Sequence, residues 1–294
     1  MKVAVARYPI GKPSDFAAFA ETQRGWLRDA ADRGAEIAVL PEFLSLELAS
    51  VFPVEVSADV PASLAAIQAL RTAWIALYRA LAVETGMLVL PGTFLLDRGG
   101  GRYRNRADVF TPDGMHGWQD KLQLTGFEKQ VGTIEGGDAL RVFEYRGLRF
   151  GVAICYDIEF PLTVRAQMEA GARLILTPSC TDTVAGAGRV RIGCLARALE
   201  NRCFVAQAVT AGDAPWSPAL DVNTGDATVY APMDVGLPDD GIVATSAGRD
   251  GWTLVDVDVD ALDASRARAQ VANDRDWARQ RAPDLLTARV ERLI

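Results

Sequence analysis

The stretch GAEIAVLP, residues 34–41, is echoed by GARLILTP, residues 171–178. Each stretch places an apolar run of strand length before a proline, and each closes a strand-helix-strand unit. Strands that alternate with helices predict an α/β fold. The echo indicates two similar halves, and because no Pro- or Ser-rich linker separates them, we expect a single domain over residues 1–272.

Strands and helices alternate on both sides of a turn-rich central region. In the first half, strands are expected at 3–8 and 37–40, joined by a helix over 15–33 that Ser14 caps. In the second half, a buried strand is expected at 148–156. The later elements of that half are expected at 160–170, 174–177, 189–201 and 204–209.

The composition is that of a globular protein with a sizeable core, since 49% of the residues are hydrophobic and 23% are charged. A formal charge of -7 gives no basic footprint for nucleic acid. No secretion signal is recognisable, and no stretch approaches the roughly 20 apolar residues that cross a bilayer. We therefore expect a cytoplasmic protein that binds neither nucleic acid nor membrane.

The chain ends in an Arg-rich stretch, residues 273–294, that is short of apolar positions. We expect this C-terminal extension either to pack on a partner subunit or to be loosely ordered. The four cysteines show no Cys-x-x-Cys spacing, and the single histidine, His116, excludes a site with several histidine ligands. We therefore expect free thiols and no metal site.

Cys155 follows an apolar run and precedes a helix. A nucleophile at a sharp strand-to-helix turn is exposed at the edge of a sheet, where backbone amides can meet a developing oxyanion. This placement suits acyl transfer. Taken alone, the same residue is better explained as a small buried hydrophobic side chain.

Glu42 directly follows the first echoed stretch, at the end of a strand, where parallel sheets present catalytic groups. Its apolar neighbours favour a desolvated carboxylate whose pKa is raised toward that of a general base. The alternative is an ordinary loop or helix-start carboxylate. His116 is the other candidate base, but a histidine in a turn is less well placed than Glu42.

Lys121 is a cation inside an otherwise apolar segment. An ammonium beside a cysteine would depress the pKa of the thiol and stabilise an oxyanion. The alternative is a solvated surface lysine.

Together, these residues and their surroundings resemble the Glu-Lys-Cys triad of the nitrilase superfamily, the carbon-nitrogen hydrolases. The motifs that carry the resemblance are Glu42 after Leu-Pro, PGT at 91–93, Lys121, GVAICYDIEFP at 151–161 and ARALEN at 196–201. Residues 178–182 and 214–218 further resemble a branch that also occurs fused to acetyltransferase domains.

The resemblance implies a four-layer α-β-β-α sandwich that forms homodimers or larger assemblies and needs no cofactor. It also implies a hydrolase of small amides or carbamoyl amides that passes through a thioester. In that mechanism Glu42 is the base, Cys155 the nucleophile, and Lys121 holds the oxyanion with the backbone amide of Tyr156. A second glutamate is implied, with Glu128 the better match and Glu135 an alternative.

Substrate contacts are less well defined by the sequence. The side chains that are candidates to approach a substrate are Trp118, Phe127, Tyr156, Asp182, Arg189 and Arg191. An arginine among them could hold a substrate carboxylate in a bidentate pair. Two other classes of function stay open, an acyltransferase that uses the same thioester and a catalytically silent interaction protein.

Overall fold

The computed structural model describes residues 1–293, and its centre is one curled sheet of 14 strands. The strand order along the main path is β4-β5-β3-β2-β1-β10-β9-β8-β7. The strands are β1 (Lys2–Pro9), β2 (Ile37–Leu40), β3 (Leu88–Pro91), β4 (Thr93–Asp97), β5 (Tyr103–Phe110), β6 (His116–Asp120), β7 (Val142–Tyr145), β8 (Leu148–Val152), β9 (Leu174–Ser179), β10 (Phe204–Asp213), β11 (Val222–Asn223), β12 (Thr228–Tyr230), β13 (Ile242–Thr245) and β14 (Gly251–Asp256).

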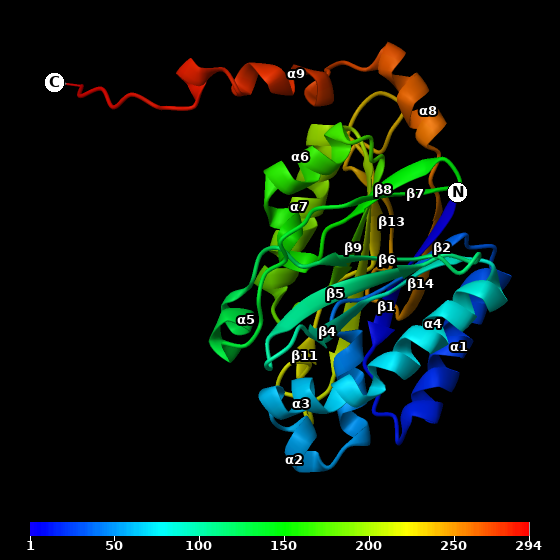
Figure 1. The fold of residues 1–294 in the computed structure, drawn as a ribbon. Coiled ribbons are helices and arrows are strands. Elements are labelled where there is room, and N and C mark those ends of the chain that lie inside the picture. The colour runs from blue at the N-terminus through cyan, green and yellow to red at the C-terminus, as the bar shows by residue number, and fades with distance from the viewer. Residues whose placement is uncertain (294) are drawn as a thin grey trace.

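Helices cover both outer faces of this sheet, as Figure 1 shows. The α-helices are α1 (Phe16–Asp32), α2 (Val54–Ser57), α3 (Val60–Ile67), α4 (Arg71–Thr85), α5 (Gly126–Val131), α6 (Pro161–Glu169), α7 (Val184–Asn201), α8 (Val259–Ala264) and α9 (Asn273–Gln280). Helices α1 and α4 lie on the half formed by β1 to β6, and α6 and α7 lie on the half formed by β7 to β10. The result is the expected α/β fold, a four-layer α-β-β-α sandwich.

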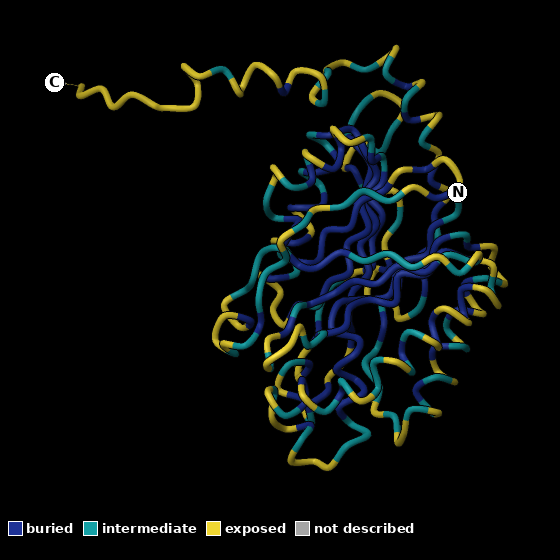
Figure 2. The backbone as a smooth tube through the Cα atoms, viewed as in Figure 1, coloured by how far each residue is buried: buried dark blue, intermediate teal, exposed yellow. Residues whose placement is uncertain are grey.

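The two echoed stretches form corresponding strands, β2 and β9. β2 pairs in parallel with β1, and β9 pairs in parallel with β8, so each closes a strand-helix-strand unit. The halves join where β1 pairs in parallel with β10. Apolar side chains from both halves meet in a shared core cluster, which belongs to the dark blue centre of Figure 2. The carboxyl ends of β2 and β9 consequently open toward the same region.

Helix α1 and its N-cap each lie one residue later than expected. The N-cap is Asp15, whose carboxylate accepts a hydrogen bond from the amide of Ala18 at 2.8 Å, and not Ser14. An aspartate is as good a cap as a serine, and here its negative charge also faces the positive end of the helix dipole. The buried face of the helix includes Phe19 and Leu27, which pack against the sheet.

One helical stretch, residues 60–85, is apolar and long enough to cross a membrane by length and composition alone. The structure divides this stretch into α3, a short 3-10 turn and α4. The inner face of α4, which includes Trp74 and Leu81, is fully buried in the protein core. The apolar side chains of this face pack in the core beside the sheet.

The C-terminal segment is anchored through α9 and then leaves the body of the protein. Trp277 of α9 is buried, and its indole Nε1 donates a hydrogen bond to the carbonyl of Glu200 in α7 at 3.1 Å. Beyond α9 the chain runs away from the sandwich as an exposed arm, drawn in red in Figure 1 and in yellow in Figure 2.

Candidate active site

Cys155 sits at a strained turn directly after β8. The strand ends at Val152, earlier than the expected 156, and a 3-10 helix, η3 (Cys155–Glu159), begins at the cysteine itself. Cys155 has a φ of 48°, a left-handed conformation that non-glycine residues adopt at a cost of about 1–3 kcal/mol. The turn leaves the side chain 4% exposed, at the base of a pocket.

Glu42 lies just after β2 with its carboxylate buried. Its Oε1 accepts a hydrogen bond from the side-chain amide of Asn105 at 2.8 Å, and its Oε2 accepts one from the backbone amide of Cys180 at 3.1 Å. Cys180 follows β9, so the ends of the two echoed strands meet at this carboxylate. The two hydrogen bonds fix its orientation beside Cys155.

Lys121 follows β6 and is as deeply buried as Glu42, each being 1% exposed. Its Nζ lies 2.8 Å from Oε1 of Glu42 and 2.8 Å from Oε2 of Glu128. The ring of Phe43 lies 5.8 Å from the same nitrogen. The surface-lysine alternative is therefore excluded, because this ammonium is held inside the protein by two carboxylates.

Glu128 is placed by the first turn of α5. Thr125 caps this helix, and the backbone amide of Thr125 donates to Oε2 of Glu128 at 2.9 Å in a reciprocal capping box. The same carboxylate contacts Lys121, and its Oε1 accepts from Asn105 at 3.3 Å. Glu135, the alternative, instead pairs with Arg102 at 2.7 Å on the surface.

Burial and the neighbouring charges both shift the pKa values in this cluster. Burial raises the pKa of Glu42, the ammonium of Lys121 opposes that rise, and the nearby Glu128 carboxylate adds to it. Burial alone would lower the pKa of Lys121, but Glu42 and Glu128 outweigh it, so the pKa lies well above its ordinary value. Lys121 is therefore a permanent cation shared by two carboxylates.

Cys155 is a neutral thiol in this environment. Its Sγ donates a hydrogen bond to the carbonyl of Cys180 at 3.5 Å. Burial and the charge of Glu42 raise the pKa of Cys155 well above its ordinary value, although Lys121 lowers it. Lys121 thus acts on the pKa of the thiol in the expected direction, but burial and Glu42 outweigh its effect. A reacting thiol here needs a base.

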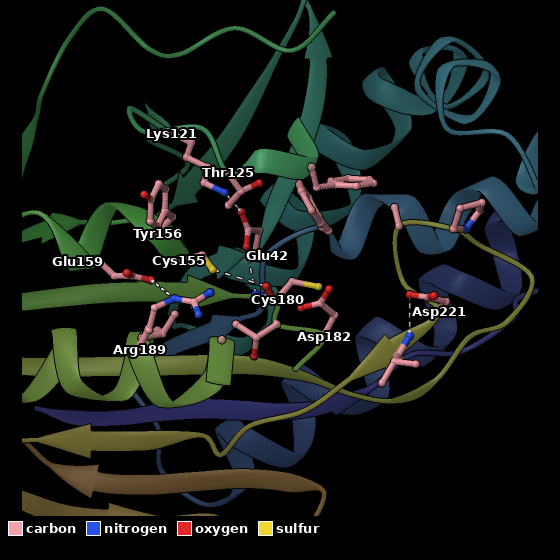
Figure 3. A pocket seen from close by; sticks show the side chains of 18 residues that line it. Glu42, Lys121, Thr125, Cys155, Tyr156, Glu159, Cys180, Asp182, Arg189 and Asp221 are labelled. Atoms are coloured by element: carbon pink, nitrogen blue, oxygen red, sulfur yellow. Dashed lines mark hydrogen bonds and ion pairs between the residues drawn. The ribbon is translucent and has the colours of Figure 1, made fainter. Parts of the chain in front are cut away.

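These side chains meet at the base of a pocket of about 250 Å³. Figure 3 shows Glu42, Lys121, Cys155 and Cys180 converging, with Glu159 and Arg189 to one side. The expected substrate contacts that line the pocket are Phe127, Tyr156, Asp182 and Arg189.

Two residues expected near the substrate lie elsewhere. Trp118 is not among the pocket residues, and its ring centroid lies 4.8 Å from the guanidinium group of Arg106 and 5.1 Å from that of Arg141. Arg191 lines a separate surface hollow on the other side of α7.

His116, the other candidate base, is also remote from the pocket. Its Nε2 lies 3.0 Å from the buried carboxylate of Asp108, and its ring stacks on Phe110. Within residues 1–293, no group of three or more His, Cys, Asp or Glu side chains is arranged to hold a metal ion.

The sequence reasoning missed Asn105 of β5, which is fully buried. Its amide nitrogen donates to both Glu42 and Glu128, and its backbone carbonyl accepts from the amide of Lys121 at 2.8 Å. Nothing in its local sequence marks this role, which arises from the pairing of β5 with the segment that carries Lys121. Asn105 connects all three charged residues of the cluster.

The chain is similar to known proteins over most of its length. A sequence model described as carbon-nitrogen hydrolase matches residues 2–268. The probable hydrolase YhcX of Bacillus subtilis is 31% identical over 95% of this chain and 54% of its own length, so the chain spans about half of that relative. The omega-amidase NIT2-B of Xenopus laevis is 26% identical, over 89% of this chain and 88% of its own.

The fold is shared with a solved amidase from Nesterenkonia sp. AN1. That structure aligns with a TM-score of 0.70 and 23% identity, covering 94% of this chain and 99% of the other. It records the Michael addition of acrylamide at the active-site cysteine of that amidase. The chain belongs to the carbon-nitrogen hydrolase family and is an enzyme of the amidase and nitrilase superfamily.

Proposed function

We propose that this enzyme hydrolyses an amide or carbamoyl-amide bond of a small molecule through a thioester on Cys155. The observation that carries the proposal is the buried Lys121 ammonium, 2.8 Å from both Glu42 and Glu128, beside a thiol at the base of a pocket. A charged cluster of this kind is costly to bury. Its presence in a pocket therefore supports a chemical role.

Acylation begins with the neutral thiol. Glu42, whose pKa is raised by burial, accepts the proton of Cys155 while Sγ attacks the substrate carbonyl carbon. An ammonium has three N–H donors, and Glu42 and Glu128 accept from two of those of Lys121. The third, with the backbone N–H of Tyr156, is free to hold the oxyanion. The C–N bond then breaks, and Glu42 gives its proton to the departing nitrogen.

Deacylation repeats these roles with water. Glu42 takes a proton from a water molecule, whose oxygen attacks the thioester carbon. Lys121 and Tyr156 hold the second oxyanion, and the C–S bond breaks as Cys155 recovers its proton from Glu42. The products are a carboxylic or carbamic acid and ammonia or an amine. Glu128 keeps the ammonium in place through both halves of the reaction.

The shape of the pocket supports hydrolysis over the alternatives. Its outer residues include the exposed Asp182, Arg189 and Val222, so water can reach the thioester. An acyltransferase would need to exclude water, and a silent interaction protein would need an occluded site. A volume of about 250 Å³ suits a small substrate and lies below the usual range for drug-sized ligands.

The substrate class is supported by one cation at the pocket rim, Arg189, and by the relatives. Arg189, 61% exposed, makes only a loose pair with Glu159 at 3.7 Å, so a substrate carboxylate can compete for the guanidinium. Two of the compared proteins are amidases by name. We therefore place simple amides that carry a carboxylate first among the substrates to test.

The decisive test is intact mass and product release with a panel of small amides, carbamoyl compounds and nitriles. Wild-type protein should release ammonia or amine and show a transient acyl adduct, and Cys155→Ala should do neither. Cys203→Ala is the matched control, because Cys203 is a fully buried thiol outside the pocket. Turnover that survives in Cys155→Ala would overturn the proposal, and acyl transfer to an added amine in preference to water would favour the acyltransferase.

A further inference from the structure

A buried carboxylate that the proposed mechanism does not use lies two residues after the nucleophile. Asp157, in η3, is 2% exposed and does not line the pocket. Its side chain is directed into the protein, toward the backbone that follows Lys121.

Both oxygens of this carboxylate are engaged by backbone amides. Oδ1 accepts from the amide of Gln123 at 2.7 Å and from that of Leu122 at 3.1 Å. Oδ2 accepts from the amide of Leu122 at 3.2 Å and from that of Ile154 at 3.3 Å. Asp157 therefore joins the residues just after Lys121 to the residue just before Cys155.

We propose that Asp157 is a positioning residue, which clamps the Lys121 segment to the Cys155 turn and so holds the ammonium beside the reacting sulfur. The inference rests on the proposed function, since it assigns Asp157 a task in that same site. Asp157 acts through Lys121 and Cys155 and does not touch the substrate.

The sheet itself does not supply this connection. Lys121 follows β6, which pairs with β5, whereas Cys155 follows β8, which pairs with β7 and β9. The two segments thus belong to different halves of the sandwich. Hydrogen bonds to an ionised acceptor are shorter and stronger than bonds between neutral groups, so several of them on one carboxylate can fix the relative position of two loops.

The carboxylate also braces the strained turn at the nucleophile. The backbone amide of Asp157 donates to the carbonyl of Ile154 at 3.0 Å, while its side chain accepts from the amide of the same residue. These two bonds enclose Cys155, whose φ of 48° needs support from its surroundings. Loss of the side chain would therefore disturb the thiol as well as the ammonium.

An amide could not replace this carboxylate. Burial raises the pKa of Asp157 to about 7, so a neutral asparagine of the same volume would avoid the desolvation cost. Asparagine, however, has one acceptor oxygen, and its NH₂ group would face an N–H donor. The geometry requires both oxygens as acceptors.

The test is Asp157→Asn, with Glu47→Gln as the matched control. Glu47 is another buried carboxylate, 1% exposed, whose pKa burial raises to about 7, and it lies outside the pocket. Two rates are measured on folded protein well below its melting temperature: kcat and KM on the best amide of the panel, and the second-order rate of acrylamide addition to Cys155, followed by intact mass and peptide mapping.

For Asp157→Asn we expect kcat to fall by about 10- to 100-fold with KM within about twofold, because a 1 Å misplacement costs about that much. Acrylamide addition should slow in parallel, since the displaced ammonium stabilises the thiolate less. Glu47→Gln should keep both rates within about twofold. A folded Asp157→Asn with wild-type values of both rates would overturn the inference.

Asp157→Glu tests the positioning role if the asparagine variant does not fold. It keeps the charge but adds one methylene, which pushes the Lys121 segment away from Cys155, so the same loss in kcat is expected. Wild-type kcat in Asp157→Glu, or failure of both variants to fold, would overturn the positioning role. Wild-type protein that neither turns over the panel nor takes up acrylamide at Cys155 would instead overturn the proposed function, and this inference with it.

Discussion

The Nζ atom of Lys121 lies 2.8 Å from Oε1 of Glu42, although 79 positions separate the two residues in the sequence. Glu128 contacts the same ammonium at 2.8 Å, so one cation serves two buried carboxylates. Burial raises the pKa of Glu42 against the opposing charge of Lys121, and the carboxylate of Glu128 adds to the rise, so Glu42 can take up a proton during the reaction.

Lys121→Met should remove the positive charge between Glu42 and Glu128 while keeping the side-chain length. Two carboxylates would remain buried without their cation, and the loss of one partner from a buried pair costs about 3–5 kcal/mol. We expect that loss in the free energy of unfolding, measured in urea, and a fall in kcat of about 10²- to 10³-fold. Lys129→Met, which removes an exposed lysine from the same segment, should change neither value. Wild-type stability in Lys121→Met would contradict the charge assignment.

Asn105→Asp tests the residue that connects the cluster. The substitution is isosteric, but it replaces the amide that donates to Glu42 and Glu128 with a third carboxylate. We expect kcat at pH 7 to fall by about 10²-fold, a loss like that of an active-site hydrogen-bond donor. The ratio of variant to wild-type kcat should rise as pH falls, because the introduced carboxyl group regains a donor when it is protonated. A ratio that does not change with pH would argue against this hydrogen bond.

The sequence predicted those parts of the site that depend on local pattern. The ends of strand-length runs located Glu42 and the region of Cys155, because strand-helix-strand units are built from neighbouring residues. The local sequence also favoured Glu128 over Glu135, since Thr125 and Glu128 have the spacing of a capping box.

The remainder depends on contacts between distant segments. The sequence could not show that Trp118 contacts Arg106 and Arg141, because these residues come from β5 and from the loop before β7. The role of Asn105 likewise follows from strand pairing and not from its neighbours in the sequence. The pKa of Cys155 required knowledge of how deeply the thiol is buried.

Glu47 should make stability depend on pH. Burial raises the pKa of this carboxyl from 4.5 to about 7, so the protonated form favours the folded state. Its contribution is fully present below pH 4.5 and is lost as pH rises through about 7, a change of roughly 3 kcal/mol. In Glu47→Gln, the decline in unfolding free energy between pH 5 and pH 8 should be smaller by about that amount. The exposed Glu55→Gln is the control, and an unchanged decline in Glu47→Gln would contradict the assignment.

The C-terminal arm should determine the assembly of the enzyme. Within the described chain, the arm beyond α9 leaves apolar side chains in solvent, among them Leu286 at 68%, Val290 at 94% and Leu293 at 98% exposed. Such residues gain about 25 cal/mol for each Å² that a partner subunit covers. We expect the full chain to form a homodimer or larger assembly in light scattering, and a chain truncated after Arg281 to form a smaller one.

Trp277 remains in the truncated chain, so its attachment to α7 and the thermal stability of the body should persist. A chain that replaces the three apolar residues with serine at full length should behave like the truncation, because burial of apolar surface and not chain length is the cause. Equal masses for all three proteins would show that the subunits associate through another surface.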